Sequence, residues 1–293
     1  MIVNSTVDPD SKCPSRYLVT IVTVSLNAIE TIYDTLTSVA GQQATFEIEH
    51  LCIDGGSKDG TRQCIEKHAH LYPNVRFLFE PDAGLFDAMN KGARMARGKY
   101  VIYLNADDFL ASPTSIENAF PKYIRAALPD LVIGTVVMGR LDQFGMKRMR
   151  VTPRWLLRYP LSGAHPPHQA TFIKTELLLS IGGFDIKARA ASDTITFYKA
   201  MRLSPQPTMY ITNAVVSFMR AGGVSNGGMK EYLKGNFETY RFLCVTDSRL
   251  NSTLRVAVKI LQKFWELRMG TLHSSQWRWW TTEKVVMRTN NDC

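Results

Sequence analysis

Residues 17–43 read YLVTIVTVSLNAIETIYDTLTSVAGQQ and predict a strand followed by a helix. The first eleven residues are almost continuously apolar and rich in β-branched side chains, as in a strand covered on both faces. Ile29, Ile32, Leu36 and Val39 then recur at helical spacing, and the helix is expected to end at Gly41. A buried strand that leads directly into a helix is typical of a βαβ unit, and therefore of a parallel sheet.

The same alternation continues for about 100 residues, which predicts an α/β fold with a mostly parallel central sheet flanked by helices. Residues 1–16 are expected to be disordered or extended, and residues 17–225 to form one domain. From about residue 226 the strand pattern stops, so residues 226–293 are expected to form a helical, basic amphipathic extension. Further strands are predicted within 46–54, 75–84, 99–108 and 129–139, and helices over 61–72, 84–98, 115–128 and 192–203. Residues 169–185 are expected to form a short strand, a helix and a turn.

Composition limits the partners that the chain can have. The 293 residues carry a net charge of +9, which favours phosphorylated small molecules, acidic lipid headgroups or nucleic acid. The five cysteines are scattered without CxxC spacing, so neither a disulfide framework nor a zinc site is expected, and a reducing, cytoplasmic location is favoured. The polar N-terminus is unlike a signal peptide, and no stretch reaches the roughly 20 apolar residues of a membrane span.

Carboxylates follow three of the predicted strands. Asp54, Asp82 and the pair Asp107 and Asp108 each come at or just after the end of a strand. Ligands of open parallel sheets bind beyond the carboxyl ends of the strands, so these turns predict a ligand site at one edge. Mg²⁺ and Mn²⁺ prefer oxygen ligands and often retain phosphate oxygens, so Asp107 and Asp108 suit a cation that a diphosphate completes.

Other nucleotide-binding classes lack their motifs in this chain. The turn DGGSKDGT, residues 54–61, is not GxGxxG, and no GxxxxGK[ST] loop occurs, which argues against a dinucleotide-binding dehydrogenase and a P-loop enzyme. A sugar-nucleotide-forming nucleotidyltransferase would need a glycine-rich N-terminal loop with a basic residue, which residues 19–30 do not provide. No recognised nucleic-acid-binding motif is present, so no nucleic-acid partner is expected.

Several motifs in a fixed order resemble family 2 glycosyltransferases, whose fold is named GT-A. TIVTVSLNAIETI, CIDGGSKDGT, EPDAGLFDAMNKG and YLNADD, within residues 17–110, resemble the nucleotide-sugar half of that family. HQATFIKTELLLSIGGFD, ASDTITF and GGVSN, within residues 111–226, resemble the acceptor half of bacterial members that build surface polysaccharides. The resemblance implies an inverting transfer of sugar from a nucleotide-sugar donor, a UDP-sugar first among them, to a hydroxyl group.

The resemblance assigns roles to residues of the donor half. Asp54 would bind the nucleobase, although an Asx-turn that ends the strand is the alternative reading of this residue. Asp107 and Asp108 match the metal-binding motif Asp-x-Asp-Asp for Mn²⁺ or Mg²⁺, with Asn105 in place of the first acid. Thr23, Ser25 and Asn27 would lie at the base and ribose, and Asp82 at the nucleoside or donor sugar. Asn90 and Lys91 would lie near the donor, and Asp107 would bind the nucleotide-sugar as well as the metal.

The resemblance also implies that the acceptor half contributes the base of the reaction. Inversion in a single displacement requires that an acceptor hydroxyl lose its proton, and Asp193 matches the family position of the general base. The alternative for Ser192 or Asp193 is a helix N-cap. Asp185 competes with Asp193 for the role of base but is expected to be a turn residue. His168 and Gln169 would shape the donor-sugar or acceptor pocket. A zinc site at His165 and His168 is not expected, because the two prolines between them prevent the helical i, i+3 geometry.

Two basic segments suggest where the acceptor is met. Residues 140–158 hold six Arg and Lys against one Asp, and residues 252–268 predict a basic amphipathic helix followed by three tryptophans. Both would attract an anionic membrane surface on the inner face of the plasma membrane, where a glycan or undecaprenyl-diphosphate-linked acceptor would be presented. The tail could instead dock on the catalytic domain or a second subunit. A noncatalytic nucleotide-sugar or glycan-binding protein of the same fold is the alternative function.

Overall fold

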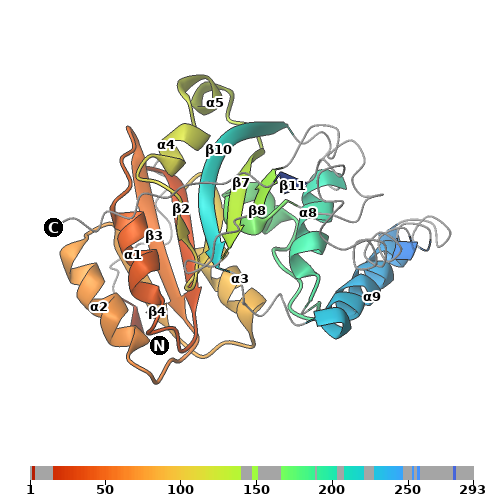
Figure 1. The fold of residues 1–293 in the computed structure, drawn as a ribbon, viewed down its shortest axis with the longest axis horizontal. Helices are drawn as coiled ribbons and strands as arrows, with labels where there is room; N and C mark the ends of the chain where they lie inside the picture. Colours follow the sequence, from red (N-terminus) through yellow and green to blue (C-terminus); the bar gives the residue numbers. More distant parts are fainter. Residues whose placement is uncertain are drawn as a thin grey trace.

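The computed structural model describes residues 2–3, 16–139, 147–150, 166–188, 190–202, 208–220, 228–246, 253, 256–257 and 280–281. Its centre is one sheet (Figure 1). The strands of this sheet follow the order β1-β4-β3-β2-β5-β9-β7-β10-β6, and β8 and β11 pair off this path. The strands of the first half are β1 (Ile2–Val3), β2 (Tyr17–Ser25), β3 (Glu47–Asp54), β4 (Val75–Phe79), β5 (Tyr100–Asn105) and β6 (Phe109–Leu110). Those of the second half are β7 (Leu131–Gly139), β8 (Lys147–Arg150), β9 (Thr171–Lys174), β10 (Met209–Arg220) and β11 (Trp280–Thr281).

Six strands of this sheet run in the same direction. β4, β3, β2 and β5 pair in parallel, and β9 is antiparallel to both β5 and β7. β7 therefore has the direction of β5, and β10 pairs with β7 in parallel. The carboxyl ends of these six strands lie at one edge of the sheet, so the prediction of a mostly parallel α/β sheet is confirmed.

Helices cover both faces of the sheet in the first half of the chain. α1 (Ile32–Ala40) and α2 (Thr61–Leu71) pack on one face, where Leu36 and Ile65 meet Cys52 of β3. α3 (Leu85–Met95) packs on the other face, where Met89 meets Leu51. Successive side chains of a strand point to opposite faces, so a strand covered on both faces is apolar throughout.

The second half contains shorter elements than the sequence predicted. The single helix expected over 115–128 is two helices, α4 (Ser115–Ala119) and α5 (Lys122–Ala127), because Pro121 stands between them. η1 (His168–Ala170) precedes β9, and α7 (Thr175–Ser180) follows it. α8 (Ser192–Arg202) lies where a helix was predicted, whereas β10 was missed.

The C-terminal segment is described only in part. α9 (Gly228–Thr246) is a helix in the segment predicted to be helical, but β11 (Trp280–Thr281) is a strand that pairs with β8. Residues 253 and 256–257 are helical, and the rest of the predicted amphipathic helix lies outside the described residues. The same holds for most of 140–158. Among the helices that the structure describes, none is both long and apolar enough to span a bilayer.

Candidate active site

A hydrogen-bond network around Asp54 joins the ends of β2 and β3. The Asp54 side chain is fully buried, with 0% of the residue exposed. Its Oδ2 accepts hydrogen bonds from the hydroxyls of Ser25 at 2.9 Å and Ser57 at 2.6 Å. Its Oδ1 accepts from the backbone N–H groups of Gly56 at 3.0 Å and Ser57 at 2.8 Å. A carboxylate has about four acceptor positions, so this network occupies the capacity of Asp54.

Asn27 belongs to the same network, whereas Thr23 does not. The backbone N–H of Asn27 donates to the Ser57 hydroxyl at 2.7 Å, and its side-chain oxygen accepts from the N–H of Lys58 at 2.9 Å. Thr23 is buried in the sheet, and its hydroxyl lies 3.0 Å from Nε2 of His50. Burial, with a smaller effect of the nearby His68, lowers the pKa of His50 to about 3. Of the three predicted pocket residues, the structure thus brings Ser25 and Asn27 to Asp54 and leaves Thr23 inside the fold.

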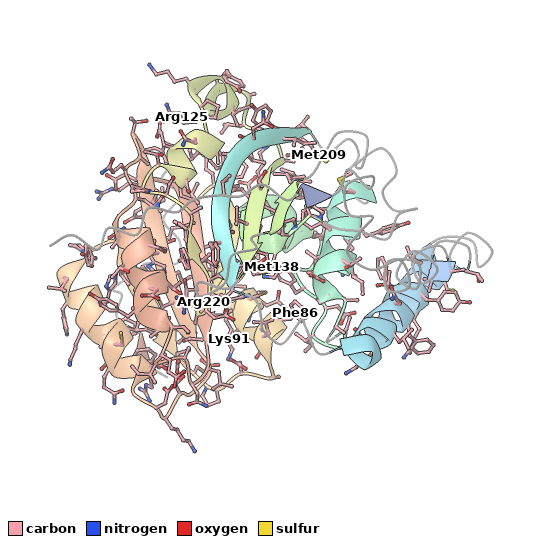
Figure 2. All side chains as sticks on the ribbon, in the orientation of Figure 1. Phe86, Lys91, Arg125, Met138, Met209 and Arg220 are labelled. Atoms are coloured by element: carbon pink, nitrogen blue, oxygen red, sulfur yellow. The ribbon has the colours of Figure 1, made fainter. Side chains whose placement is uncertain are left out.

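Lys91 supports the loop that carries Asp82. Its ammonium donates to the carbonyl oxygen of Pro81 at 2.7 Å and lies 3.2 Å from a carboxylate oxygen of Glu80. Asp82 is partly exposed, and its Oδ1 accepts from the N–H of Gly84 at 2.9 Å. The contacts of Lys91 are therefore with the loop that carries Asp82. Figure 2 labels Lys91 close to this edge of the sheet.

Asn90 of α3 joins the first part of the chain to the turn before α8. Its amide nitrogen donates to the carbonyl oxygen of Phe184 at 2.8 Å, and its side-chain oxygen accepts from the N–H of the same residue at 2.9 Å. The preceding Gly183 accepts a hydrogen bond from the Thr196 hydroxyl of α8 at 3.2 Å. Asn90 on α3 thus fixes the turn on which α8 rests.

We predict that Gly183→Ala destabilises the protein by about 1–3 kcal/mol, because φ at this residue is +64°. A Cβ at Gly183 would also lie 2.4 Å from the side-chain oxygen of Asn90. Urea unfolding measures the change. Gly182→Ala is the matched control, since φ there is +81° but no atom lies within 4 Å of the added Cβ. Equal losses in the two variants would show that the contact with Asn90 adds nothing.

Asp108 is the buried member of the acidic pair. Only 1% of the residue is exposed, while Asp107 is partly exposed. Oδ1 of Asp108 accepts from the backbone N–H of Arg220 at 3.1 Å. Oδ2 accepts from the amide of Gln169 at 3.2 Å and, more weakly, from that of Asn105 at 3.4 Å. The predicted pocket residue Gln169 therefore contacts the acidic motif, and His168 begins η1 beside it.

Asp193 lies in the first turn of α8. The backbone N–H of Ile195 donates to the carbonyl oxygen of Ala191 at 2.9 Å, so the helix begins directly after Ala191. The N-cap residue is therefore Ala191, one or two residues before the predicted Ser192 or Asp193. Oδ1 of Asp193 accepts from the N–H of Thr194 at 2.7 Å. The helix N-terminus favours the charged carboxylate there.

A family model described as Glycosyl transferase family 2 matches residues 20–181, more than half of the chain. The chain belongs to glycosyl transferase family 2. The match includes every donor-half residue discussed above and ends just before Gly183. Asp193 and Arg220 lie beyond it.

Two solved structures show that this family 2 member has the GT-A fold. Staphylococcus aureus TarS in complex with UDP has a TM-score of 0.60 and 17% identity, covering 86% of this chain and 73% of TarS. The mannosyltransferase PcManGT of Pyrobaculum calidifontis, in complex with GDP-Man and Mn²⁺, has a TM-score of 0.57 and 19% identity, covering 93% and 80%. An uncharacterized glycosyltransferase of Mycobacterium tuberculosis is 32% identical over 177 residues, which are 60% of this chain and 65% of that protein.

The acidic motif of this family 2 chain fits a hard cation with few protein ligands. The side-chain oxygen of Asn105 is buried and has no hydrogen-bond partner, and the partly exposed Asp107 lies two residues away. Both offer oxygen, the ligand that Mg²⁺ and Mn²⁺ prefer. Within the described ranges, no group of three or more His, Cys, Asp or Glu residues could hold a metal ion. A cation held by these two oxygens would also take oxygen ligands from the substrate and water.

Burial and, secondarily, the charge of Asp107 raise the pKa of Asp108 to about 7. The folded protein retains this proton at pH values where the unfolded chain has released it, so Asp108 lowers stability as pH rises from about 4 to about 7. We predict that Asp108→Asn changes the free energy of unfolding of the metal-free protein in a pH-dependent way. The value for the variant minus the value for wild type should be more positive at pH 7.5 than at pH 4.5. Urea unfolding at both values, in EDTA, measures the difference. If the stability of the variant relative to wild type does not increase with pH, the raised pKa of Asp108 is contradicted.

Arg220 is the residue of this edge that sequence reasoning missed. Its guanidinium pairs with Asp34 of α1 and lies 5.7 Å from the centre of the Phe109 ring, while its backbone holds Asp108. Figure 2 labels Arg220 at the edge opposite Met209, the first residue of β10. Arg220 is the last residue of β10, so a prediction of this strand would have placed it at the same edge of the sheet. The strand was not predicted, and Arg220 was therefore missed.

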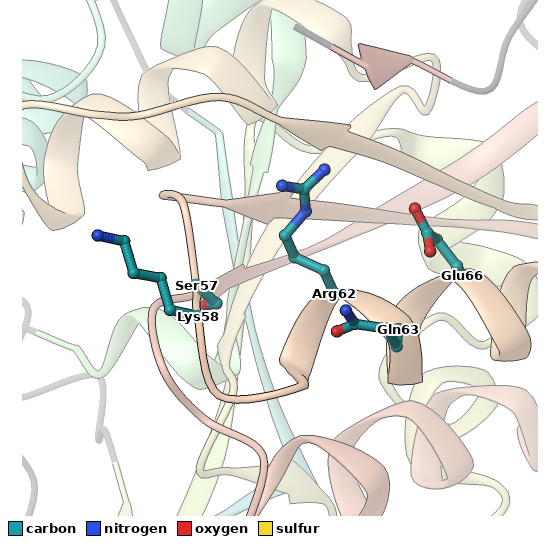
Figure 3. A pocket seen from close by; sticks show the side chains of 5 residues that line it. All are labelled: Ser57, Lys58, Arg62, Gln63 and Glu66. Carbon is teal, nitrogen blue, oxygen red and sulfur yellow. The ribbon is translucent and has the colours of Figure 1, made fainter.

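A cavity of about 290 Å³ lies beside the Asp54 network (Figure 3). Ser57, which bonds to Asp54, forms part of its wall, and the Arg62 guanidinium lies 4.6 Å from the centre of the Phe79 ring. None of the predicted donor residues lines this cavity. The lining residues are Ser57, Lys58, Arg62, Gln63 and Glu66.

Proposed function

We propose that this protein is an inverting glycosyltransferase that moves a sugar from a nucleotide-sugar, a UDP-sugar first among the candidates, to a hydroxyl group of a glycan. The observation that carries the proposal is the linkage between the two halves. Asp107 and Asn105 offer oxygen ligands at the end of β5, and the Asn90–Phe184 hydrogen bonds attach the turn that supports α8, and with it Asp193.

The donor side rests on the strand ends. Asp107 and the side-chain oxygen of Asn105 would hold Mg²⁺ or Mn²⁺, which when bound neutralises the charge that develops on the departing diphosphate. Gln169 and Arg220 keep the Asp108 carboxylate in place, and Asp108 in turn fixes the conformation of the motif. The complexes of TarS with UDP and of PcManGT with GDP-Man and Mn²⁺ support this reading for a shared fold.

Asp193 performs the proton transfer in the proposed reaction. Its carboxylate takes the proton of the acceptor hydroxyl while that oxygen bonds to C1 of the donor sugar. The bond between C1 and the diphosphate oxygen breaks in the same step, and the configuration at C1 inverts. The N-terminus of α8 stabilises the carboxylate before the proton arrives.

The acceptor class is inferred from charge. The net charge of +9 and the basic residues of 140–158 favour an anionic acceptor or surface. A glycan carried on undecaprenyl diphosphate, at an anionic membrane surface, has that chemistry. The pathway that we propose is bacterial surface-polysaccharide synthesis, such as exopolysaccharide, capsule or O-antigen.

A thermal-shift panel of nucleotide-sugars, with and without Mn²⁺, tests the proposal. A donor that binds only the folded protein raises Tm by mass action, so we expect a UDP-sugar to raise Tm in Mn²⁺ and much less in EDTA. The Asp107→Asn variant should lose the Mn²⁺-dependent part of the shift. If no nucleotide-sugar at millimolar concentration raises Tm under either condition, the proposed function is wrong.

A further inference from the structure

The Asp82 carboxylate occupies the space above Gly55. A Cβ built on Gly55 would lie 2.3 Å from Oδ2 and 3.0 Å from Cγ of Asp82. Gly55 is not among the glycines with a left-handed φ in the described residues, so its backbone conformation does not demand glycine. The lack of a side chain is needed instead for space, because it admits the carboxylate of a residue 27 positions later.

Asp54 is poorly suited to recognise a base. It is fully buried, and each of its two oxygens already accepts two hydrogen bonds. To bind a ligand it would have to give up the Ser25 bond, which joins the ends of β2 and β3, or one of the three bonds that hold the turn at Gly56 and Ser57. Asp82 is the adjacent carboxylate, and it is partly exposed. Its Oδ1 bonds to the N–H of Gly84, and the Lys91 ammonium holds the preceding Pro81.

The strand order places Asp82 at the distance of a base from the acidic motif. Asp82 lies over Gly55, directly after β3, and Asp107 follows β5. β2 separates these two strands, so their ends are about 10 Å apart at the usual strand spacing. If the diphosphate lies at Asp107, the ribose spans the end of β2 and the base reaches Asp82.

We propose that Asp82, and not Asp54, selects the nucleobase of the donor by accepting a hydrogen bond from a ring N–H. This inference rests on the proposed function. Uracil, thymine and guanine carry such an N–H next to a carbonyl group. Cytosine and adenine have a bare acceptor nitrogen at the corresponding position, which a carboxylate repels. Gly55 determines this selectivity indirectly, since any side chain there would displace the carboxylate.

Calorimetric titration of UDP and CDP in Mn²⁺ tests the proposal with the full chain. We expect wild type to prefer UDP and Asp82→Asn to lower UDP affinity about tenfold or more, because the amide offers a donor where the carboxylate accepted. The same amide can donate to N3 of cytosine, so the ratio of UDP to CDP affinity should fall further. If wild type instead binds GDP more tightly than UDP, the titrations compare GDP with ADP in place of UDP with CDP.

Gly55→Ala is the second variant, since it should reproduce the loss of selectivity with Asp82 intact. Gly41→Ala is its control, because φ there is −77° and the nearest atom to an added Cβ is 3.3 Å away. If Asp82→Asn keeps the wild-type ratio, the inference is wrong and the proposed function survives. If wild type binds no nucleoside diphosphate, both are wrong.

Discussion

Asp193→Asn is expected to lower kcat by about 10²–10⁴-fold, the usual contribution of a general base. The amide has the shape of the carboxylate and can still accept the hydrogen bond that the Thr194 N–H donates at 2.7 Å. It cannot accept a proton from the acceptor hydroxyl. Donor affinity should stay within about twofold, because Asp193 binds no part of the nucleotide in the proposed reaction. Steady-state sugar transfer and UDP titration together measure both quantities.

Asp185→Asn is the matched control for this prediction. Asp185 lies in the turn before α8, is partly exposed, and its Oδ1 accepts from the N–H of Lys187 at 2.9 Å, as expected of a turn residue. We expect this variant to transfer sugar at the wild-type rate. Transfer at the wild-type rate by Asp193→Asn would mean that another group is the base. A wild-type protein that binds donor and transfers nothing to any acceptor would favour the noncatalytic alternative.

The sequence predicted the first half of the sheet because its strands are buried on both faces. Residues 17–25 and 100–104 are apolar almost without interruption, and helical periodicity follows or precedes each. β10 gave a weaker signal, since polar Thr212 and Asn213 interrupt it and its pairing with β7 shifts register between Ile211 and Ser217. A strand with bulges loses the strict alternation on which the prediction depends.

The roles of individual carboxylates could not be ranked from the sequence. Asp54 looked available at the end of a strand, but its bonds to Ser25 and Ser57 appear only when two loops meet. Asp107 and Asp108 are adjacent in the chain, and which of them is buried depends on partners 61 and 112 residues away. Whether all acceptor positions of a carboxylate are occupied depends on the tertiary structure. The sequence therefore predicted the edge of the sheet at which the carboxylates lie, but not which of them remain available to a ligand.

The two members of the acidic pair are expected to respond differently to the same substitution. Asp107→Asn should lower kcat/KM about 100-fold or more, since an amide is a weaker ligand for a divalent cation and the cation supplies several kcal/mol of charge stabilisation. UDP affinity in Mn²⁺ should fall toward its value in EDTA. Asp108→Asn should keep Mn²⁺-dependent UDP affinity within about threefold, because its lone pairs face Arg220, Gln169 and Asn105 instead of the ligand.

Titration of UDP across a range of Mn²⁺ concentrations separates the two variants. A cation held by Asp107 and by the unpaired oxygen of Asn105 predicts that the Mn²⁺ concentration for half-maximal binding rises sharply in Asp107→Asn and little in Asp108→Asn. The reverse order would place the cation on the buried carboxylate. That result would require Asp108 to release its three donors on binding, and with them the contact between β5 and the end of β10.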